Sequence, residues 1–98
     1  MLFRSLYAEL LSSEGKHGEA AMQYEYTAYQ YGKHEKAAEA GYAALLAYRK
    51  HEPTLQGKAR ADWHLAGITS ALRFATTFPD HKQALAVRTL SEIGRAHV

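Results

Sequence analysis

Apolar residues recur at intervals of three and four along the whole chain, and short stretches that contain glycine or proline interrupt them. This spacing places apolar side chains on one face of an α-helix, whereas a β-strand requires an alternation that the sequence never sustains. Alanine, a strong helix former, is frequent, while valine and isoleucine are too scarce to build a sheet. The sequence therefore predicts an all-α protein of about five helices.

Glycine and proline predict where these helices end. The first helix contains Leu6 to Leu11 and stops before Gly15, which suits the left-handed conformation that follows many helices. The segment 52–57 predicts a loop or weak turn, because Pro53 forces the preceding residue away from helical angles. We expect the remaining helices over residues 18–31, 35–51 and 58–78, and from residue 81 onward.

The apolar stripe of each helix predicts the core. Its expected members are Ala20, Tyr24, Thr27, Ala28 and Tyr31 on the second helix, Ala37, Ala40, Gly41, Ala44, Leu45 and Tyr48 on the third, Trp63, Ala66, Gly67, Ser70, Ala71, Phe74 and Phe78 on the fourth, and Ala84, Leu85, Val87 and Leu90 on the fifth. Tyr26 and Tyr29 lie off this stripe and are expected to be partly exposed. Gly41 costs about 1 kcal/mol relative to alanine inside a helix, which predicts that a neighbouring backbone crosses closely there.

The composition fits one small domain of 98 residues, of which 47% are hydrophobic and 22% charged. Cysteine is absent, so disulfides, thiolate zinc sites and cysteine nucleophiles are excluded. The sequence contains neither an apolar run long enough to span a bilayer nor a signal-peptide pattern, and we expect no membrane insertion. The formal net charge of +2 comes without a basic stripe, so no nucleic-acid partner is expected.

Both ends of the chain match one artificial nucleotide sequence. By reverse translation, residues 92–98 can be encoded by GAG ATC GGA AGA GCA CAC GTC, which from its second base is the start of a widely used short-read sequencing adapter. Residues 1–5 can be encoded by GTG CTC TTC CGA TCT, with GTG as the start codon, and this string is the reverse complement of the same adapter. We therefore expect 1–5 and 92–98 to be translated adapter and 6–91 to be a segment of a longer protein. Leaving out two basic residues and one acidic residue lowers the net charge from +2 to +1.

Two turn segments of the chain resemble each other. "YGKHEKAAEA" (31–40) and "FPDHKQALAV" (78–87) share an aromatic residue, a helix breaker, a histidine, two polar residues and an alanine in the same order. Ala28 and Ala75 precede them at equal distances. Each segment ends one helix, turns the chain and opens the next helix with small residues. A unit of this kind cannot bury its apolar face alone, so the pattern predicts stacked repeats.

With these features the chain resembles the tetratricopeptide repeat family over nearly all of residues 6–91. The positions that carry the resemblance are Gly15, Ala20, Tyr24, Gly41, Ala71, Phe74 and Pro79. The marker tryptophan of the family is missing from the first helices, and "HEPTLQGKARADW" makes the hairpin longer than the usual repeat. The turn segments are also similar to those of bacterial cell-envelope repeat proteins, which favours the periplasmic side over the cytoplasm.

The resemblance implies an α-α solenoid of antiparallel helix pairs that acts as a protein-interaction scaffold, with a protein or peptide as partner. In the family, first helices line a concave groove, and the corresponding residues here are Glu9, Ser12, Glu35, Ala38, Tyr42 and Leu45. The alternative is a helical module of a larger cell-envelope enzyme or assembly factor whose chemistry lies outside these residues. A segment cut at both ends also predicts self-association through apolar ends that include Leu6, Leu10, Leu11, Leu85 and Leu90.

The sequence contains no recognisable catalytic or metal-binding motif. No two histidines have the HExxH spacing of a zinc site, and neither a glycine-rich phosphate loop nor a nucleophile elbow is present. His34 and His81 occupy equivalent turn positions, where capping or packing is their expected role. His17 and His51 are expected to be exposed at helix ends. We therefore expect no catalysis by this segment, no cofactor and no metal.

Overall fold

The computed structural model describes residues 2–30 and 36–96, and the side chains of residues 6–30 and 36–90. These residues form five α-helices and no strand, which confirms the predicted all-α class. The elements are α1 (Leu2–Ser13), α2 (His17–Tyr29), α3 (Ala37–His51), a short 3-10 helix η1 (Glu52–Thr54), α4 (Gly57–Thr77) and α5 (Ala84–Ala96).

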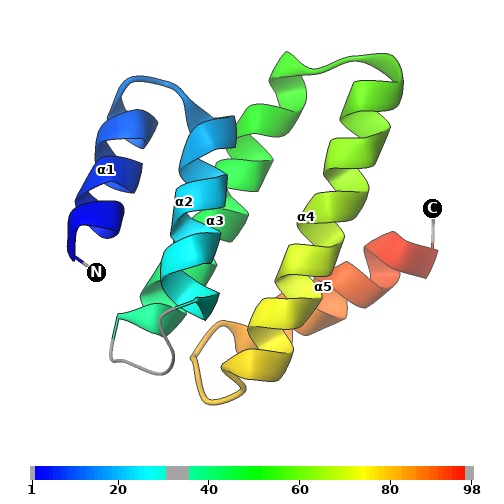
Figure 1. The fold of residues 1–98 in the computed structure, drawn as a ribbon. Helices are drawn as coiled ribbons and strands as arrows, with labels where there is room; N and C mark the ends of the chain where they lie inside the picture. Colours follow the sequence, from blue (N-terminus) through cyan, green and yellow to red (C-terminus); the bar gives the residue numbers. More distant parts are fainter. Residues whose placement is uncertain (1, 31–35, 97–98) are drawn as a thin grey trace.

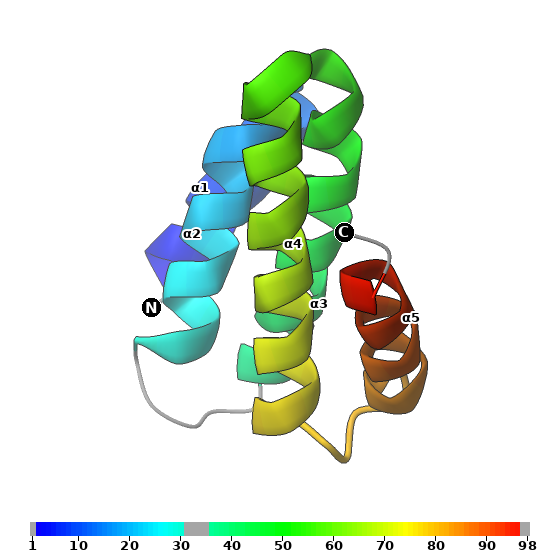
Figure 2. The ribbon, with the colours of Figure 1, turned by 90° about the vertical axis from the view of Figure 1, so that its right-hand side faces the viewer.

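Each helix packs mainly on its neighbours in the sequence: α1 on α2, α2 on α3, α3 on α4 and α4 on α5. Figure 1 shows α1, α2 and α4 following one another across the molecule, with α3 between α2 and α4. In Figure 2, α4 lies in front, and α5 lies beside α4 on the same side as α3. Because packing proceeds along the sequence, the molecule is flat, with extents of 36, 31 and 18 Å.

Small side chains build the core between α1, α2 and α3. Leu11, Ala20, Ala21, Ala47 and Tyr48 form one buried cluster, and the half-buried rings of Tyr24 and Trp63 pack against it. Alanine allows two helix backbones to approach closely, and its helix propensity supports both helices.

The predicted stripes of α2 and α3 are largely confirmed. Their buried members are Ala20, Thr27, Ala28, Ala37, Ala40, Gly41, Ala44 and Tyr48. Tyr24 and Leu45 are half-buried instead, and Tyr31 lies outside the described residues. Ala21 and Ala47 are buried although the stripes omitted them. A helix that packs on neighbours at two sides buries a wider face than one apolar stripe.

Helix α4 differs more from its predicted stripe. Ser70 and Phe74 are buried as predicted, and Ala66 is exposed. The remaining stripe residues, Trp63, Gly67, Ala71 and Phe78, are half-buried. Beside the stripe, Ile68 and Leu72 are half-buried and Leu65 is exposed. One side of this helix therefore faces an open space rather than a core.

The close approach predicted at Gly41 exists, but the neighbour is not a backbone. A Cβ atom at Gly41 would lie 3.0 Å from Cδ1 of Phe74 and 3.3 Å from Cε2 of Phe78. Gly41 therefore makes room for two aromatic rings of α4 and of the turn that follows it. The predicted backbone crossing is wrong, because side chains of this size keep the two helix axes apart.

The turns lie close to where the sequence predicts them, but their structures differ in detail. Gly15 has a φ of +80°, the predicted left-handed conformation, and the N–H of Lys16 closes the end of α1 with a 2.8 Å bond to the carbonyl of Leu11. The expected loop 52–57 begins as the short helix η1, which extends α3 by one turn. Helix α5 begins at Ala84 rather than at His81, because residues 78–83 form the turn.

The two ends of the array expose large apolar side chains. Leu6 and Leu10 on α1 are 60% and 54% exposed, and Leu85 and Leu90 on α5 are 77% and 64% exposed, as predicted. Leu11 is an exception, because it points into the α1–α2–α3 cluster and is buried. Helix α1 begins at residue 2 and α5 ends at residue 96, so both helices continue through the adapter boundaries expected from the sequence. None of the described helices has the length and apolar character needed to cross a membrane.

Candidate functional site

A groove with a volume of about 450 Å³ lies between α3, α4 and α5. Its lining residues are Leu45, Tyr48, Arg49, Glu52, Pro53, Trp63, His64, Gly67, Ile68, Ala71, Val87 and Leu90. The charged members come from the end of α3, from η1 and from the start of α4, and α5 contributes only apolar ones. The groove therefore combines an apolar wall with one charged end.

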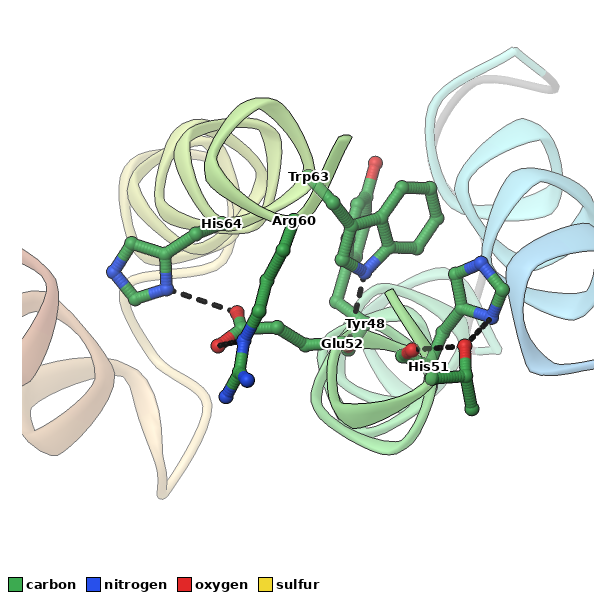
Figure 3. A network of polar contacts seen from close by, with 7 residues as sticks. Tyr48, His51, Glu52, Arg60, Trp63 and His64 are labelled. Carbon is green, nitrogen blue, oxygen red and sulfur yellow. Dashed lines mark hydrogen bonds and ion pairs between the residues drawn. The ribbon is translucent and has the colours of Figure 1, made fainter. Parts of the chain in front are cut away.

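Aromatic packing fixes the charged end of the groove. The indole Nε1 of Trp63 donates a 3.0 Å hydrogen bond to the carbonyl oxygen of Tyr48, and their ring centroids lie 4.5 Å apart. The ring of His51 meets the indole edge-on at 4.7 Å (Figure 3). On its other side His51 lies over Gly18, where a Cβ atom would come within 2.9 Å of Nε2. These contacts hold α3, α4 and the start of α2 in one arrangement.

Glu52 connects η1 to the first turns of α4. One carboxylate oxygen lies 2.9 Å from Nδ1 of His64, and the other lies 3.8 Å from Nε of Arg60 (Figure 3). Arg60 and His64 are four residues apart, so they share one face of α4 and reach the same carboxylate. Both pairs are partly exposed, and the ion pair with Arg60 contributes about 0.2–1 kcal/mol. Their main effect is to fix the side chains at the mouth of the groove.

Behind the groove a second carboxylate joins three helices. Glu25 on α2 accepts two hydrogen bonds of 2.7 Å, one from the hydroxyl of Tyr48 on α3 and one from the hydroxyl of Ser70 on α4. Burial raises the pKa of Tyr48, and the hydrogen bond to Glu25 raises it further. Because each carboxylate oxygen has a donor, the charge is stabilised in a half-buried position.

Tyr29 on α2 packs beside this carboxylate. The guanidinium of Arg73 lies 3.9 Å above the centre of its ring, and Phe78 lies 5.9 Å away on another side. Burial raises the pKa of Tyr29 to about 12, with Arg73 opposing the shift and Glu25 adding to it. The hydroxyl is buried without a hydrogen-bond partner. Tyr29 is half-buried and Tyr26 is exposed, so both side chains are at least partly exposed, as predicted.

His81 occupies the turn before α5 and has the predicted capping and packing role. Its Nδ1 accepts the backbone N–H of Gln83 at 3.1 Å, so in the neutral ring the proton belongs to Nε2, which lies 3.2 Å from Glu39. The ring stacks on Tyr42 at 5.6 Å and meets Phe74 edge-on at 5.1 Å.

The other histidines differ from expectation or lie outside the described part of the chain. His34 belongs to the segment 31–35, which the structure does not describe. His17 and His51 were expected to be exposed, yet both are half-buried, and Nδ1 of His17 is buried without a partner. Within residues 2–30 and 36–96, no three histidine or carboxylate side chains gather as metal ligands would.

The residues predicted to line a groove are divided between two parts of the molecule. Leu45 lines the observed groove, while Tyr42, one turn earlier on α3, packs against Phe74 and His81. Ala38 is half-buried at the start of α3. Glu9 and Ser12 lie on α1, where Glu9 is close enough to Tyr24 to add to the rise that burial causes in the pKa of that tyrosine. Glu35 lies outside the described residues.

The predicted repeat positions have structural roles that follow from their surroundings. Ala20, Gly41 and Phe74 are buried, Tyr24 packs against the central cluster, Gly15 ends α1, Ala71 lines the groove, and Pro79 is exposed in the turn after α4. These roles fit a helical hairpin array, and they fit other helical arrangements equally.

Sequence reasoning missed the two carboxylates that organise the site. Glu25 gives no local signal, because its partners come from residues 23 and 45 positions away. The pairing at Glu52 had a signal, since Arg60 and His64 have helical spacing and follow a short connection.

Comparison of the chain with protein-family models, with curated proteins and with solved structures finds no match. The tetratricopeptide resemblance therefore stays a prediction.

Proposed function

We propose that this chain is a protein-interaction scaffold, a tetratricopeptide-like segment that binds a partner peptide in the groove between α3, α4 and α5. The proposal assigns no reaction to the segment. The observation that carries it is the groove itself, in which an apolar wall stands beside a charged end. Protein interfaces combine an apolar centre with a polar margin in the same way.

The size and chemistry of the groove favour a peptide with apolar side chains. A volume of about 450 Å³ accommodates a few aliphatic or aromatic side chains. Leu45, Ile68 and Leu90 offer them apolar contacts, and each such side chain gains roughly 1.5–3 kcal/mol when it is fully buried. Arg49 and Glu52 then orient the peptide by its polar groups.

The packing of the helices supports the scaffold proposal. Each described helix packs mainly on its neighbours in the sequence, which is the contact pattern of repeat proteins. Such an array leaves apolar side chains uncovered at its two ends and along its open faces. The exposed leucines of α1 and α5 lie at these ends.

Trp63 provides the test, because it is the only tryptophan of the sequence and it lines the groove. A library of amphipathic peptides is titrated into the chain while the indole emission is followed. The test variant is Leu90→Lys, and the matched control is Leu85→Lys. Both leucines are exposed on α5, but only Leu90 lines the groove.

We expect Leu90→Lys to weaken the binding of recovered peptides at least about tenfold, which corresponds to the loss of roughly 1.4 kcal/mol. Leu85→Lys should bind them as the wild type does. If both variants bind equally well, or if the library yields no binder, the groove is not a peptide site.

A further inference from the structure

Two apolar faces without a partner lie at opposite ends of the described array. One is on α1, where Leu6 and Leu10 are more than half exposed and Tyr7 is nearly so. The other is the groove, whose wall includes Val87 and the exposed Leu90 of α5. Figure 1 shows α1 and α5 at the two sides of the molecule, so a single copy cannot bring these faces together.

The charges beside the two faces are complementary. Glu9 is exposed on α1 between Leu6 and Leu10, and Arg49 is exposed at the charged end of the groove. Within the part of the chain that the structure describes, neither side chain forms an ion pair. A carboxylate therefore accompanies the apolar helix face, and a guanidinium accompanies the apolar wall that could receive it.

The spacing of the residues is also compatible. On α1, Glu9 follows Leu6 by three residues, a rise of about 4.5 Å, and on α3, Arg49 follows Leu45 by four residues, a rise of about 6 Å. A helix that lays Leu6 against Leu45 in the same direction brings Glu9 close to Arg49. The long arginine side chain covers the remaining difference.

We propose that the groove accepts α1 of a second copy of this chain, so that copies associate head to tail. This inference rests on the proposed function, since it names an occupant for the same groove. Leu6 and Leu10 of one copy contact the apolar wall of the next, and Glu9 pairs with Arg49. The contact is heterologous, so an open assembly keeps one free groove and one free α1, and its length grows with concentration.

The decisive experiment uses two variants, each of which spoils one half of the contact. Leu10→Lys places a charge on the α1 face and leaves the groove intact. Leu90→Lys spoils the groove and leaves α1 intact. Circular dichroism verifies that both variants fold, and Met22→Lys, which changes an exposed side chain of α2, is the control.

Sedimentation velocity on the 98-residue chain at about 0.1–1 mM gives the readout, a range suited to a small and weak contact. We expect the wild type and Met22→Lys to form larger species as concentration rises, and each leucine variant alone to stay monomeric. An equimolar mixture of the two leucine variants should form a one-to-one dimer and nothing longer, because it contains one compatible pair of faces.

Other outcomes overturn the inference. A Leu90→Lys variant that still associates alone indicates symmetric contact through α1, and a Leu10→Lys variant that does so indicates symmetric contact through α5. A mixture that stays monomeric also contradicts head-to-tail docking, as does a monomeric wild type. If the wild type is monomeric yet binds library peptides, this inference fails while the proposed function stands.

A charge exchange tests the register independently. Glu9→Arg and Arg49→Glu should each weaken association about tenfold, a loss of roughly 1.4 kcal/mol. The double variant, or a mixture of the two single variants, should recover it. If neither the double variant nor the mixture restores association, these two side chains do not face each other.

Discussion

The interface between α2 and α3 and the interface around α5 are built on different plans. Where α2 meets α3, the buried side chains are mostly alanines, and Ala20, Ala37 and Ala44 are almost completely enclosed. Helix α5 buries Ala84 at its first turn, but it leaves Leu85 and Leu90 largely in solvent. Small apolar side chains thus fill the interface between α2 and α3, and large ones remain exposed on α5.

This difference separates stability from binding capacity. Alanines close the centre without leaving space for a ligand, because two helices with small side chains can come into direct contact. Exposed leucines gain free energy only when another surface covers them. The centre therefore holds the fold, and the ends and the groove provide the surface for a partner.

Polar groups follow the same division. Glu25 lies in the centre and receives hydrogen bonds from two other helices, so the loss of one partner leaves a half-buried charge less well satisfied. Glu52 lies at the edge, where solvent screens its pairs with Arg60 and His64.

The largest expected effect distinguishes a central side chain from a peripheral one. Phe74 has no exposed surface and contacts the rings of Tyr42, Phe78 and His81. Phe74→Ala should lower the free energy of unfolding by about 3–5 kcal/mol, since it removes a buried ring and leaves a cavity. Leu85→Ala should change it by less than about 0.5 kcal/mol. Urea denaturation followed by circular dichroism measures both, and similar losses would remove the contrast between centre and end.

Two glycines test the same contrast between the closed centre and the open groove, with a smaller expected effect. Gly41 lies against Phe74 and Phe78, so Gly41→Leu should overpack the centre and lower stability by about 1–3 kcal/mol. Gly67 lines the groove, and a Cβ atom there would lie an ordinary 3.6 Å from Tyr48. Gly67→Ala should raise stability by up to about 1 kcal/mol through helix propensity. If the denaturant midpoints of both variants move in the same direction, the packing around Gly41 and around Gly67 is equally dense.

The smallest expected effect concerns alkaline pH. Because the folded pKa of Tyr29 is raised to about 12, its contribution to stability is complete below the unfolded value of 10 and is lost as pH rises from 10 towards 12. Tyr29→Phe should flatten this loss. It should cost little at pH 7, because the hydroxyl has no hydrogen-bond partner. Tyr26→Phe, on the exposed side of α2, serves as the control. If stability falls between pH 10 and 12 as steeply in Tyr29→Phe as in the wild type, burial does not protect the Tyr29 hydroxyl from ionisation.

Helix type and position were predictable from the sequence because they depend on local spacing and on helix breakers such as Gly15. The number of faces that a helix buries was not predictable, since it depends on which other helices pack against it. Ala66 was expected in the core and is exposed, whereas the next two residues, Gly67 and Ile68, line the groove. The role of Glu25 was invisible for the same reason, as both of its donors belong to other helices.

Parts of the candidate site were within reach of the sequence. Leu45, Val87 and Leu90 were assigned to apolar stripes, and all three line the groove. Tyr42 was expected to face a partner, and its half-buried ring packs on His81 and Phe74. The ring of His81 comes from the turn before α5, so its contact with Tyr42 depends on the tertiary fold and gives no local signal in the sequence.

Native-state hydrogen exchange, measured amide by amide, tests the division between a closed centre and open ends most directly. Amides with few buried contacts around them exchange through local openings of low free energy, whereas core amides require global unfolding. We predict that the amides of α2 and α3 exchange only with global unfolding and that those of residues 85–90 on α5 exchange through smaller openings. Protection of α5 equal to that of α3 would contradict the account.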